Sequence, residues 1–583
     1  MNTDVLLNEM GVKEEVVTKC IEHWANVSGE KLFLYYGESG KKLTYWQFNQ
    51  ITNSIGHSLM EKGIKKGDRI SVFLKNPFIT TMVMFGIWKC GAIFSPINFN
   101  YRGKLLSYQL IDTEPQLLIT ERAMVPILNE ISSEIQGLQA AVHNSLEGDH
   151  DYIAEIAELP LNQNFIEFPF ERLMQGPTNN LNVEINYWDT ANIIYTSGTT
   201  GPAKGVVQSH RWINGYTLRM RLFMTQADVV YNDLPLYHVG GAFANIAKAA
   251  YSGCTVAIWD KFSPKQFWNR IETCGASMAI LLDVMIPWLV NAQPSENDRM
   301  NTLNKVHMQP LPKYHHEVAK RFGIDIVSAG FGQTESGNPL AGMIIELEPG
   351  KGSPEHFKKG MERHEILERC NTFQIPVIEG NKKLDKGFMG KPTKFFEVAV
   401  LDNQDLEVSA GKVGQIAFRP KLPHLIMSEY FNKPNSTTKA FKNLWFHTGD
   451  AGYLGEDGYY YFVDRLGGVI RSRGEKISSY QLEDIITSHS EIDFCAAFPV
   501  PAEEGDEDDV AIYVVKKANS EIDEEELSEW AEGQMPKYMW PKYIRFTVDL
   551  PRTPTNKVEK YKLRDELLQE LTAIRENQSS LQI

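Results

Sequence analysis

A dense loop of glycines and hydroxyl residues directly follows an apolar run near residue 195. The apolar run covers residues 193–195, and the loop reads TSGTTGPAKG over residues 196–205. A strand that ends in such a loop points backbone N–H groups and hydroxyls at one place, which is how proteins hold phosphate oxygens. Lys204 adds a mobile positive charge, but no Ser or Thr follows it, so the loop is not the common GxxxxGK[ST] motif. The pattern predicts phosphate binding at the end of a β-strand; a plain solvated loop is the alternative.

The chain is too long for one hydrophobic core. With 583 residues it should form at least two domains. Helical and strand patterns alternate through the first three quarters, which predicts layered α/β domains with mostly parallel sheets. Ligands bind at the carboxyl ends of the strands in such sheets.

Two stretches show this alternation clearly. Ser263 and Pro264 suggest a helix start, apolar residues recur at helical spacing up to Gly275, and residues 276–282 read as a strand. The same order recurs in residues 312–323 and 324–328. The sequence FGQTE, residues 331–335, is then expected in a loop after a strand that ends at residues 328–330.

The pattern of expected helices and strands changes after Asp464 and Arg465. Beyond this point we expect an amphipathic helix at residues 478–489, a strand at 510–515 and a helix with an acidic first turn at 523–534. The prediction is a large N-terminal domain, residues 1–465, and a small mobile α+β domain, residues 468–583, with a hinge at about 466–467. Residues 348–387 interrupt the alternation of helix and strand patterns and are expected to form a surface loop or a lid.

Composition excludes several classes of protein. A net charge of −15 and a pI near 5.5 argue against nucleic-acid binding, which needs a basic face. The six cysteines are scattered without a CxxC pair, so they read as buried thiols. The sequence begins without a signal-peptide pattern, and its longest apolar stretch, residues 81–97, is too short to span a bilayer. A cytoplasmic protein is expected.

Four further positions offer chemistry that suits a nucleotide. Glu335, close to phosphates, makes sense with an intervening Mg²⁺, which prefers one or two carboxylates with phosphate oxygens and water. Asp450, at the end of WFHTGD, can accept hydrogen bonds from ribose hydroxyls, and Arg465 supplies a fixed cation. Lys557 in PRTPTNKVEK can offset charge that builds on an α-phosphate. Each of these taken singly is as well explained by an ordinary surface residue.

The order of the motifs adds a family resemblance. The segments TSGTTGPAKG, FGQTES, WFHTGDAGY, FVDRLGGVIRSRGEKIS and LPRTPTNK occur in this sequence in the order typical of the adenylate-forming superfamily of acyl-CoA synthetases. The chain resembles that superfamily from about residue 31 to 563. Within it, the segments LPLYHVGG, SPKQFWNRIETCGAS, QPSENDR and EYFNKPNSTTKAF are most similar to carnitine/crotonobetaine–CoA ligases.

The resemblance implies a reaction in two steps and a set of site residues. A small carboxylic acid would attack ATP to give an acyl-AMP and pyrophosphate, and coenzyme A would then take the acyl group. Phosphate contacts are implied for Thr196, Ser197, Gly198, Thr199, Thr200, Gly201 and Lys204. Nucleotide contacts are implied for Gly330, Phe331 on adenine, Gly332, Gln333, Thr334 on the α-phosphate, and Asp450 and Arg465 on the ribose. The resemblance further implies Mg²⁺ on Glu335, the first-step catalytic lysine at Lys557, a gate at His238, and a thiol-tunnel loop with Arg473 and Gly474.

Several alternatives stay open at this point. His238 also suits an ordinary core histidine. The long segment 348–387 resembles an insertion of fatty-acyl-AMP ligases, so the acceptor is either CoA or the phosphopantetheine of a carrier protein. A non-catalytic nucleotide-binding relative is the third reading. The pocket for the acid is expected to involve Trp212, Tyr216, Met220 and residues 238–243, 306–310 and 330–337. It would suit a short or medium acyl group or, as an aromatic cage, a quaternary ammonium.

Overall fold

The computed structural model describes residues 3–10, 16–196, 203–282, 285–385, 387–466, 469–473, 475–502, 507–551, 558 and 560–580. The chain divides into two compact units. The larger unit comprises Met1–Phe99, Gln109–Tyr195 and Gly205–Asp464; the smaller comprises Asn100–Tyr108, Thr196–Lys204 and Arg465–Ile583. The predicted hinge residue Gly467 lies outside the described part of the chain.

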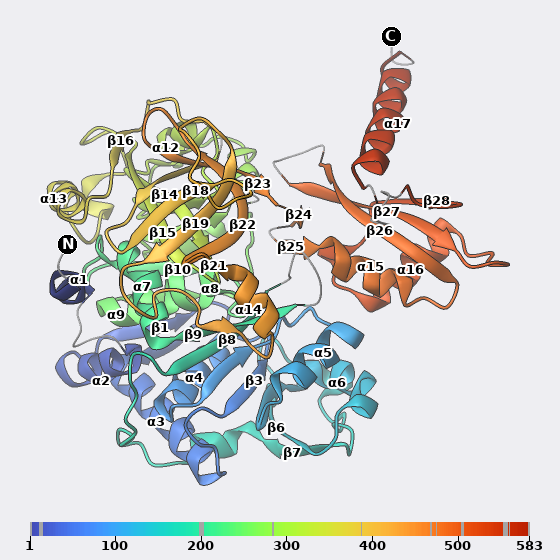
Figure 1. The fold of residues 1–583 in the computed structure, drawn as a ribbon. Helices are drawn as coiled ribbons and strands as arrows, with labels where there is room; N and C mark the ends of the chain where they lie inside the picture. Colours follow the sequence, from blue (N-terminus) through green and yellow to red (C-terminus); the bar gives the residue numbers. More distant parts are fainter. Residues whose placement is uncertain are drawn as a thin grey trace. The chain divides into compact units, whose positions relative to one another are not determined.

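The first sheet of the larger unit contains a parallel half (Figure 1). Its neighbouring strands run in the order β14 (Ile326–Gln333), β13 (Lys305–Gln309), β12 (Met278–Leu282), β10 (Val229–Asn232), β11 (Thr255–Ile258) and β1 (Leu32–Tyr36). β2 (Lys41–Thr44) pairs antiparallel with β1 at the edge. The α/β class with parallel strands is therefore confirmed for this half.

The sheet continues beyond β14 with antiparallel pairs, which the alternation of helix and strand did not predict. β14 forms a hairpin with β15 (Gly337–Ile345). The further strands are β17 (Phe388–Pro392), β23 (Tyr460–Arg465), β22 (Trp445–Leu454), β19 (Gly414–Pro420) and β18 (Phe396–Leu401), with β21 (Phe441–Lys442) paired to β22. This extension brings the WFHTGD motif, on β22, into the same sheet as FGQTE.

A second sheet is mostly parallel. Its order is β20 (Glu429–Tyr430), β9 (Lys204–Ser209), β8 (Thr190–Thr196), β4 (Ile93–Pro96), β3 (Arg69–Phe73), β5 (Leu117–Glu121), β6 (Leu138–His143) and β7 (Phe165–Pro169). The pairs from β8 to β7 are parallel, and β20 is antiparallel to β9. The glycine-rich loop thus follows a strand, as its sequence predicted.

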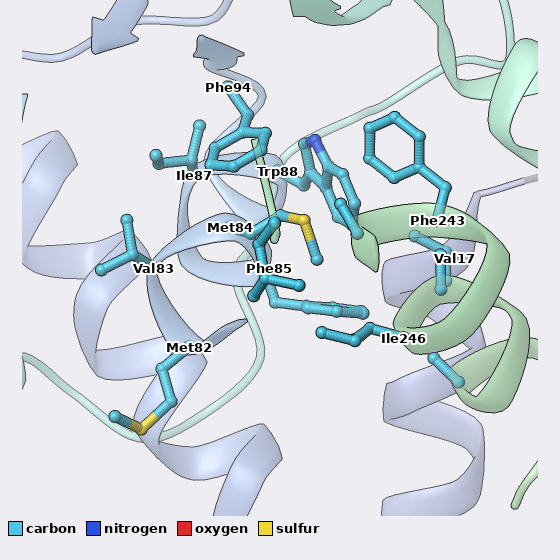
Figure 2. Packing of buried hydrophobic residues seen from close by; sticks show 14 of the residues in the cluster. Val17, Met82, Val83, Met84, Phe85, Ile87, Trp88, Phe94, Phe243 and Ile246 are labelled. Atoms are coloured by element: carbon cyan, nitrogen blue, oxygen red, sulfur yellow. The ribbon is translucent and has the colours of Figure 1, made fainter. Parts of the chain in front are cut away.

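Helix α4 (Pro77–Lys89) lies at the centre of the largest core cluster. It begins with Asn76, whose side chain accepts hydrogen bonds from two backbone N–H groups of the first turn, and with a proline at the first helical position. All its residues are buried, as expected for a helix that is apolar on every side. Figure 2 shows Phe85 and Trp88 facing Phe243 and Ile246. The long apolar stretch of the sequence, residues 81–97, therefore divides between this buried helix and strand β4.

The other helices that surround these sheets are α1 (Thr3–Met10), α2 (Val17–Val27), α3 (Tyr45–Glu61), α5 (Gly103–Thr113), α6 (Val125–Glu130), α7 (His210–Arg221), α8 (Val239–Gly241), α9 (Lys248–Ser252), α10 (Phe267–Cys274), α11 (Ile286–Val290), α12 (His315–Phe322), α13 (Arg363–Phe373) and α14 (Pro434–Ala440). A π-helical turn, Ala242–Ala247, joins α8 to α9. α10 and α12 end at Gly275 and Gly323, whose positive φ angles of 63° and 73° suit glycine. The predicted start of α10 at Ser263 and Pro264 is wrong, because a turn precedes Phe267.

Residues 348–387 form part of the packed larger unit. Within them, α13 buries Ile366 and Cys370 in a core cluster. β16 (Val377–Glu379) adds a parallel strand to β15. These parts of the segment are therefore packed helix and strand instead of the expected surface loop, and a role as a lid stays a prediction.

The smaller unit contains a three-stranded sheet and a hairpin. β26 (Ile492–Pro501) is antiparallel to β27 (Asp508–Lys516), which is parallel to β28 (Tyr543–Thr547). The hairpin consists of β24 (Val469–Ser472) and β25 (Glu475–Ser478), and the helices are α15 (Ser479–Thr487), α16 (Glu524–Gln534) and α17 (Lys560–Ser580). The predicted helices at 478–489 and 523–534 and the strand at 510–515 are present. Asp523 and Glu526 form a capping box at the start of α16.

None of the helices in the described part of the chain combines the length and apolar character that a membrane crossing requires. All six cysteines are described, and each is a free thiol. The prediction of buried thiols holds for five of them, whereas Cys274 is only partly buried.

Candidate active site

Two of the sequence motifs meet through a buried hydrogen bond between Gln333 and Asp450. Gln333 closes β14, and its Nε2 donates to Asp450 Oδ2 at 2.5 Å and to the Thr448 carbonyl at 3.2 Å. Gln333 is 7% exposed and Asp450 only 2%. Gln333 Oε1 is buried without a hydrogen-bond partner among the described residues. Buried polar atoms are normally paired, so this oxygen marks a place where a ligand donor fits.

The turn after β14 is shorter than the sequence suggested. β14 runs to Gln333, and β15 begins at Gly337, so residues 334–336 make the turn. The expectation that the strand stops at residues 328–330 is wrong, because Gly330 and Phe331 pair with residues of β15. Gly330 and Gly332 therefore lie on the strand itself.

Glu335 is held at this turn by both its backbone and its carboxylate. Its carbonyl accepts hydrogen bonds from Met427 N at 2.7 Å and from Trp212 Nε1 at 3.3 Å. Its Oε1 accepts from the Tyr430 hydroxyl at 3.1 Å. These contacts fix the backbone and one carboxylate oxygen of Glu335 at the turn. A single carboxylate beside phosphate oxygens fits the donor set that Mg²⁺ prefers.

The neighbouring residues of FGQTE are also anchored. Gln208 Nε2 donates to the Thr334 carbonyl at 2.8 Å, and Thr334 is half-buried. The Phe331 ring is 7% exposed and lies 5.5 Å from the Phe418 ring, centroid to centroid. Its stacking on adenine stays a prediction.

Arg219 of α7 lies directly behind Gly330. Its Nη1 donates to the carbonyls of Ala329 and Leu340 at 2.9 and 3.1 Å. A Cβ on Gly330 would lie 2.1 Å from this nitrogen and 2.4 Å from the Leu340 carbonyl oxygen. Glycine at this position therefore allows the close approach of the guanidinium to the strand.

A cavity extends from this arginine into the larger unit. The space between the atoms that line it amounts to about 540 Å³ and includes open solvent, so the cavity is not closed off. Its lining includes Arg219, Met220, Phe223, Lys248, Met278, Ala279, Lys305, Val306, His307, Ile326, Ser328, Ala341, Gly342, Met343, Ile366 and Ile375. Met220, Val306 and His307 were predicted to line the acid pocket; Arg219 and Lys248 were not.

The suggested aromatic cage does not surround this cavity. Trp212 and Tyr216 stack on each other with ring centroids 4.7 Å apart and planes 16° apart. Phe243 packs edge-on against Trp212 at 5.9 Å. Of these three rings, none lines the cavity.

The other predicted residues lie at the ends of elements or outside the described part. Thr196 ends β8 and Lys204 begins β9, whereas Ser197, Gly198, Thr199, Thr200 and Gly201 are not described. His238 precedes α8, and its ring lies 4.4 Å from that of Tyr237.

In the smaller unit, Arg473 is exposed at the tip of the β24–β25 hairpin. Its backbone N donates to Glu507 Oε2 at 2.6 Å. Gly474 and Lys557 lie outside the described residues, as does the side chain of Arg465 at the end of β23.

The comparisons with known proteins agree with this architecture. The model of the AMP-binding enzyme family matches residues 21–431, and that of the AMP-binding enzyme C-terminal domain matches residues 481–557. A crotonobetaine/carnitine–CoA ligase of Escherichia coli O9:H4 (strain HS) is 27% identical over 549 residues, 93% of this chain and 97% of the relative.

Two solved structures share the fold. An o-succinylbenzoate CoA synthetase mutant of Bacillus subtilis, bound to a product analogue, has a TM-score of 0.72 at 20% identity, covering 94% of this chain and 98% of that one. A fatty acyl CoA synthetase of Mycobacterium tuberculosis has a TM-score of 0.60 at 22% identity, covering 95% and 98%. The chain therefore belongs to the AMP-binding enzyme family and is an adenylate-forming acid–thiol ligase of the acyl-CoA synthetase kind.

Proposed function

We propose that this ligase activates a small carboxylic acid through an acyl-adenylate and transfers the acyl group to coenzyme A. The observation that supports it most is the Gln333–Asp450 hydrogen bond, which joins two nucleotide motifs 117 residues apart. A buried carboxylate held by an amide is a rigid acceptor for ribose hydroxyls. The anchored Glu335 lies two residues beyond this contact.

In the first step a carboxylate oxygen of the acid bonds to the α-phosphorus of ATP. The bond from that phosphorus to the bridging oxygen breaks, and pyrophosphate leaves. Thr334 and Lys557 are assigned to the α-phosphate, where positive charge and hydrogen bonds stabilise the developing negative charge. Residues 196–204 are assigned to the β- and γ-phosphates, and Phe331 to adenine.

Glu335 is the residue assigned to a magnesium ion. When bound, Mg²⁺ neutralises negative charge on the phosphates. The Tyr430 hydroxyl fixes the carboxylate through its 3.1 Å hydrogen bond to Oε1.

In the second step the thiol sulfur attacks the acyl carbonyl carbon. The bond from that carbon to the AMP oxygen breaks, and AMP leaves. Exposed Arg473 and its sequence neighbour Gly474 are assigned to the thiol channel, and His238 to the boundary between acid and thiol.

Pyrophosphate release with ATP, Mg²⁺ and a panel of carboxylic acids, each with and without CoA, tests this proposal. We expect release that depends on one class of acid and is accelerated by CoA. Release indifferent to CoA would instead indicate a carrier protein as acceptor. ATP binding without release for any acid would contradict the proposal and favour a non-catalytic relative.

A further inference from the structure

We propose that the cavity behind β14 binds a second carboxylate of the substrate, so that the enzyme acts on dicarboxylic acids. The proposal rests on the acyl-CoA ligase function above and adds the substrate class. Arg219 and Lys248 are the two side chains that would hold this second carboxylate.

Arg219 carries unused donors at the cavity. It is 6% exposed, and its Nε and Nη2 are buried without hydrogen-bond partners among the described residues. Burial lowers its pKa to about 10, so it stays protonated at neutral pH. A guanidinium presents its N–H groups in a planar fork that matches a carboxylate.

Lys248 adds a second buried cation. It begins α9 and is 2% exposed. Within the described part of the chain, no hydrogen bond or ion pair joins its ammonium to another residue. Burial lowers its pKa to about 8, so most molecules carry this charge at pH 7.

The charges of Arg219 and Lys248 face no carboxylate among the residues that line the cavity, although nearby Asp228 acts electrostatically on Lys248. Of the residues that line it, Lys305 pairs with Asp228 at 2.6 Å, and none is itself an Asp or Glu. His307 is neutral, because burial and then the nearby Arg219 lower its pKa to about 3. Buried charges without a counter-ion are costly, so an anionic ligand would offset the cost of these two.

The cavity also lies in line with the predicted reaction centre. Side chains alternate along a strand, so Ser328, Gly330 and Gly332 share one face of β14. Ser328 lines the cavity and Gly330 contacts Arg219, and this face of the strand continues through Gly332 toward the turn that begins at Thr334. At roughly 3.3 Å per residue, about 7 Å of strand separates Ser328 from Gly330. A flexible diacid can therefore place one carboxylate at the ATP site and the other between the cations.

The same charges disfavour a quaternary ammonium. Carnitine or crotonobetaine would bring a third positive charge close to Arg219 and Lys248. Like charges in a poorly solvated site repel strongly. The structure therefore predicts a substrate unlike those in the names of the Escherichia coli relatives.

Adipate and its monomethyl ester provide the direct test. Both can present a carboxylate to ATP and have nearly the same length, but only adipate carries a second carboxylate at its other end. We expect kcat/KM for pyrophosphate release to be roughly 100-fold higher with adipate, from the typical loss when a buried charge pair is broken. Succinate, glutarate and suberate, each against its monoester, locate the best length, and carnitine should be a poor substrate.

Substitution of Lys248 tests whether the preference for adipate over its monoester arises in the cavity. Lys248→Met should bring the adipate-to-ester ratio close to one. Lys89→Met is the matched control, because Lys89 is also a buried lysine, but it bonds to Asn53 Oδ1 at 2.5 Å outside the cavity. Its ratio should stay at the wild-type value. If Lys248→Met fails to fold, Arg219→Lys, which keeps the charge but not the fork, should lower the ratio.

A binding measurement separates this proposal from the ligase function. Calorimetric titration of the wild type with adipate and with monomethyl adipate needs no turnover. If adipate binds, the monoester does not, and Lys248→Met abolishes adipate binding, the cavity holds the second carboxylate even if no acid releases pyrophosphate. Equal binding and equal turnover of diacid and ester, or a ratio unchanged in Lys248→Met, would overturn it.

Discussion

Replacing Gln333 with leucine should weaken both the fold and the ATP site. The leucine keeps a similar volume but removes the donor that Asp450 Oδ2 and the Thr448 carbonyl accept. A hydrogen bond to a charged group contributes about 1.5–3 kcal/mol, and both partners here are buried. We therefore expect the free energy of unfolding to fall by about 2 kcal/mol.

The same change should raise KM for ATP. If the released Asp450 carboxylate costs ATP binding about 1.4–2.8 kcal/mol, KM rises roughly 10- to 100-fold. Denaturant unfolding gives the stability term, and steady-state pyrophosphate release at varied ATP gives KM. Gln415→Leu is the control: Gln415 lies on the adjoining strand β19 and bonds His447 Nδ1 at 3.0 Å, away from Asp450.

A double-mutant cycle with Asp450→Asn sharpens the test. If the two side chains act as a unit, the double variant should lose much less than the sum of the single losses. Additive losses would refute the coupling. So would a Gln333→Leu enzyme whose stability and KM for ATP match those of the Gln415 control.

Three further predictions follow from other parts of the structure. Gly330→Ala should nearly abolish activity and lower the melting temperature, because its Cβ would meet Arg219 Nη1 at 2.1 Å; Gly533→Ala in α16, with no atom within 4 Å, should be neutral or stabilising. Burial lowers the pKa of Lys248 from 10.5 to about 8, with smaller effects from Cys254, Asp228 and Lys305. Between pH 8 and 10.5 the amine is therefore protonated in the unfolded chain but mostly neutral in the folded protein. The free energy of unfolding should rise with pH over this range. Adipate binding needs the protonated amine, so its KM should rise above about pH 8; a flat profile identical to that of Lys248→Met would contradict this. Lys557→Ala should remove most acyl-AMP formation yet retain thioester formation from supplied acyl-AMP, and equal loss of both half-reactions would count against the assigned role.

Much of the fold could be predicted from local patterns. The helices that end at Gly275 and Gly323 and the buried strands after them follow from apolar spacing and from a residue that tolerates positive φ. The antiparallel extension beyond β15 could not be predicted this way, because pairing between distant strands leaves no local periodicity. Residues 331–335 were expected in a loop, yet pairing with β15 extends the strand to Gln333.

The site, too, was predictable from the sequence only in part. The motifs identified Gln333, Glu335 and Asp450 as candidates, but only the three-dimensional structure shows that the first and last are in contact. Tyr430 was missed although it lies in EYFNKP, since a tyrosine in a polar segment gives no sign of its partner. Lys248 does leave a signal, as a lysine within the run ANIAKAAY. Its proximity to a buried arginine depends on tertiary packing.

Isotope transfer tests the acyl-adenylate most directly. The enzyme would be incubated with ATP, Mg²⁺, CoA and adipate labelled with ¹⁸O in its carboxylates, and the products analysed by mass spectrometry. Attack of the carboxylate on the α-phosphorus leaves one ¹⁸O atom on AMP after thiolysis, and none on pyrophosphate. Label in a product other than AMP, or thioester formation with unlabelled AMP, would contradict the mechanism.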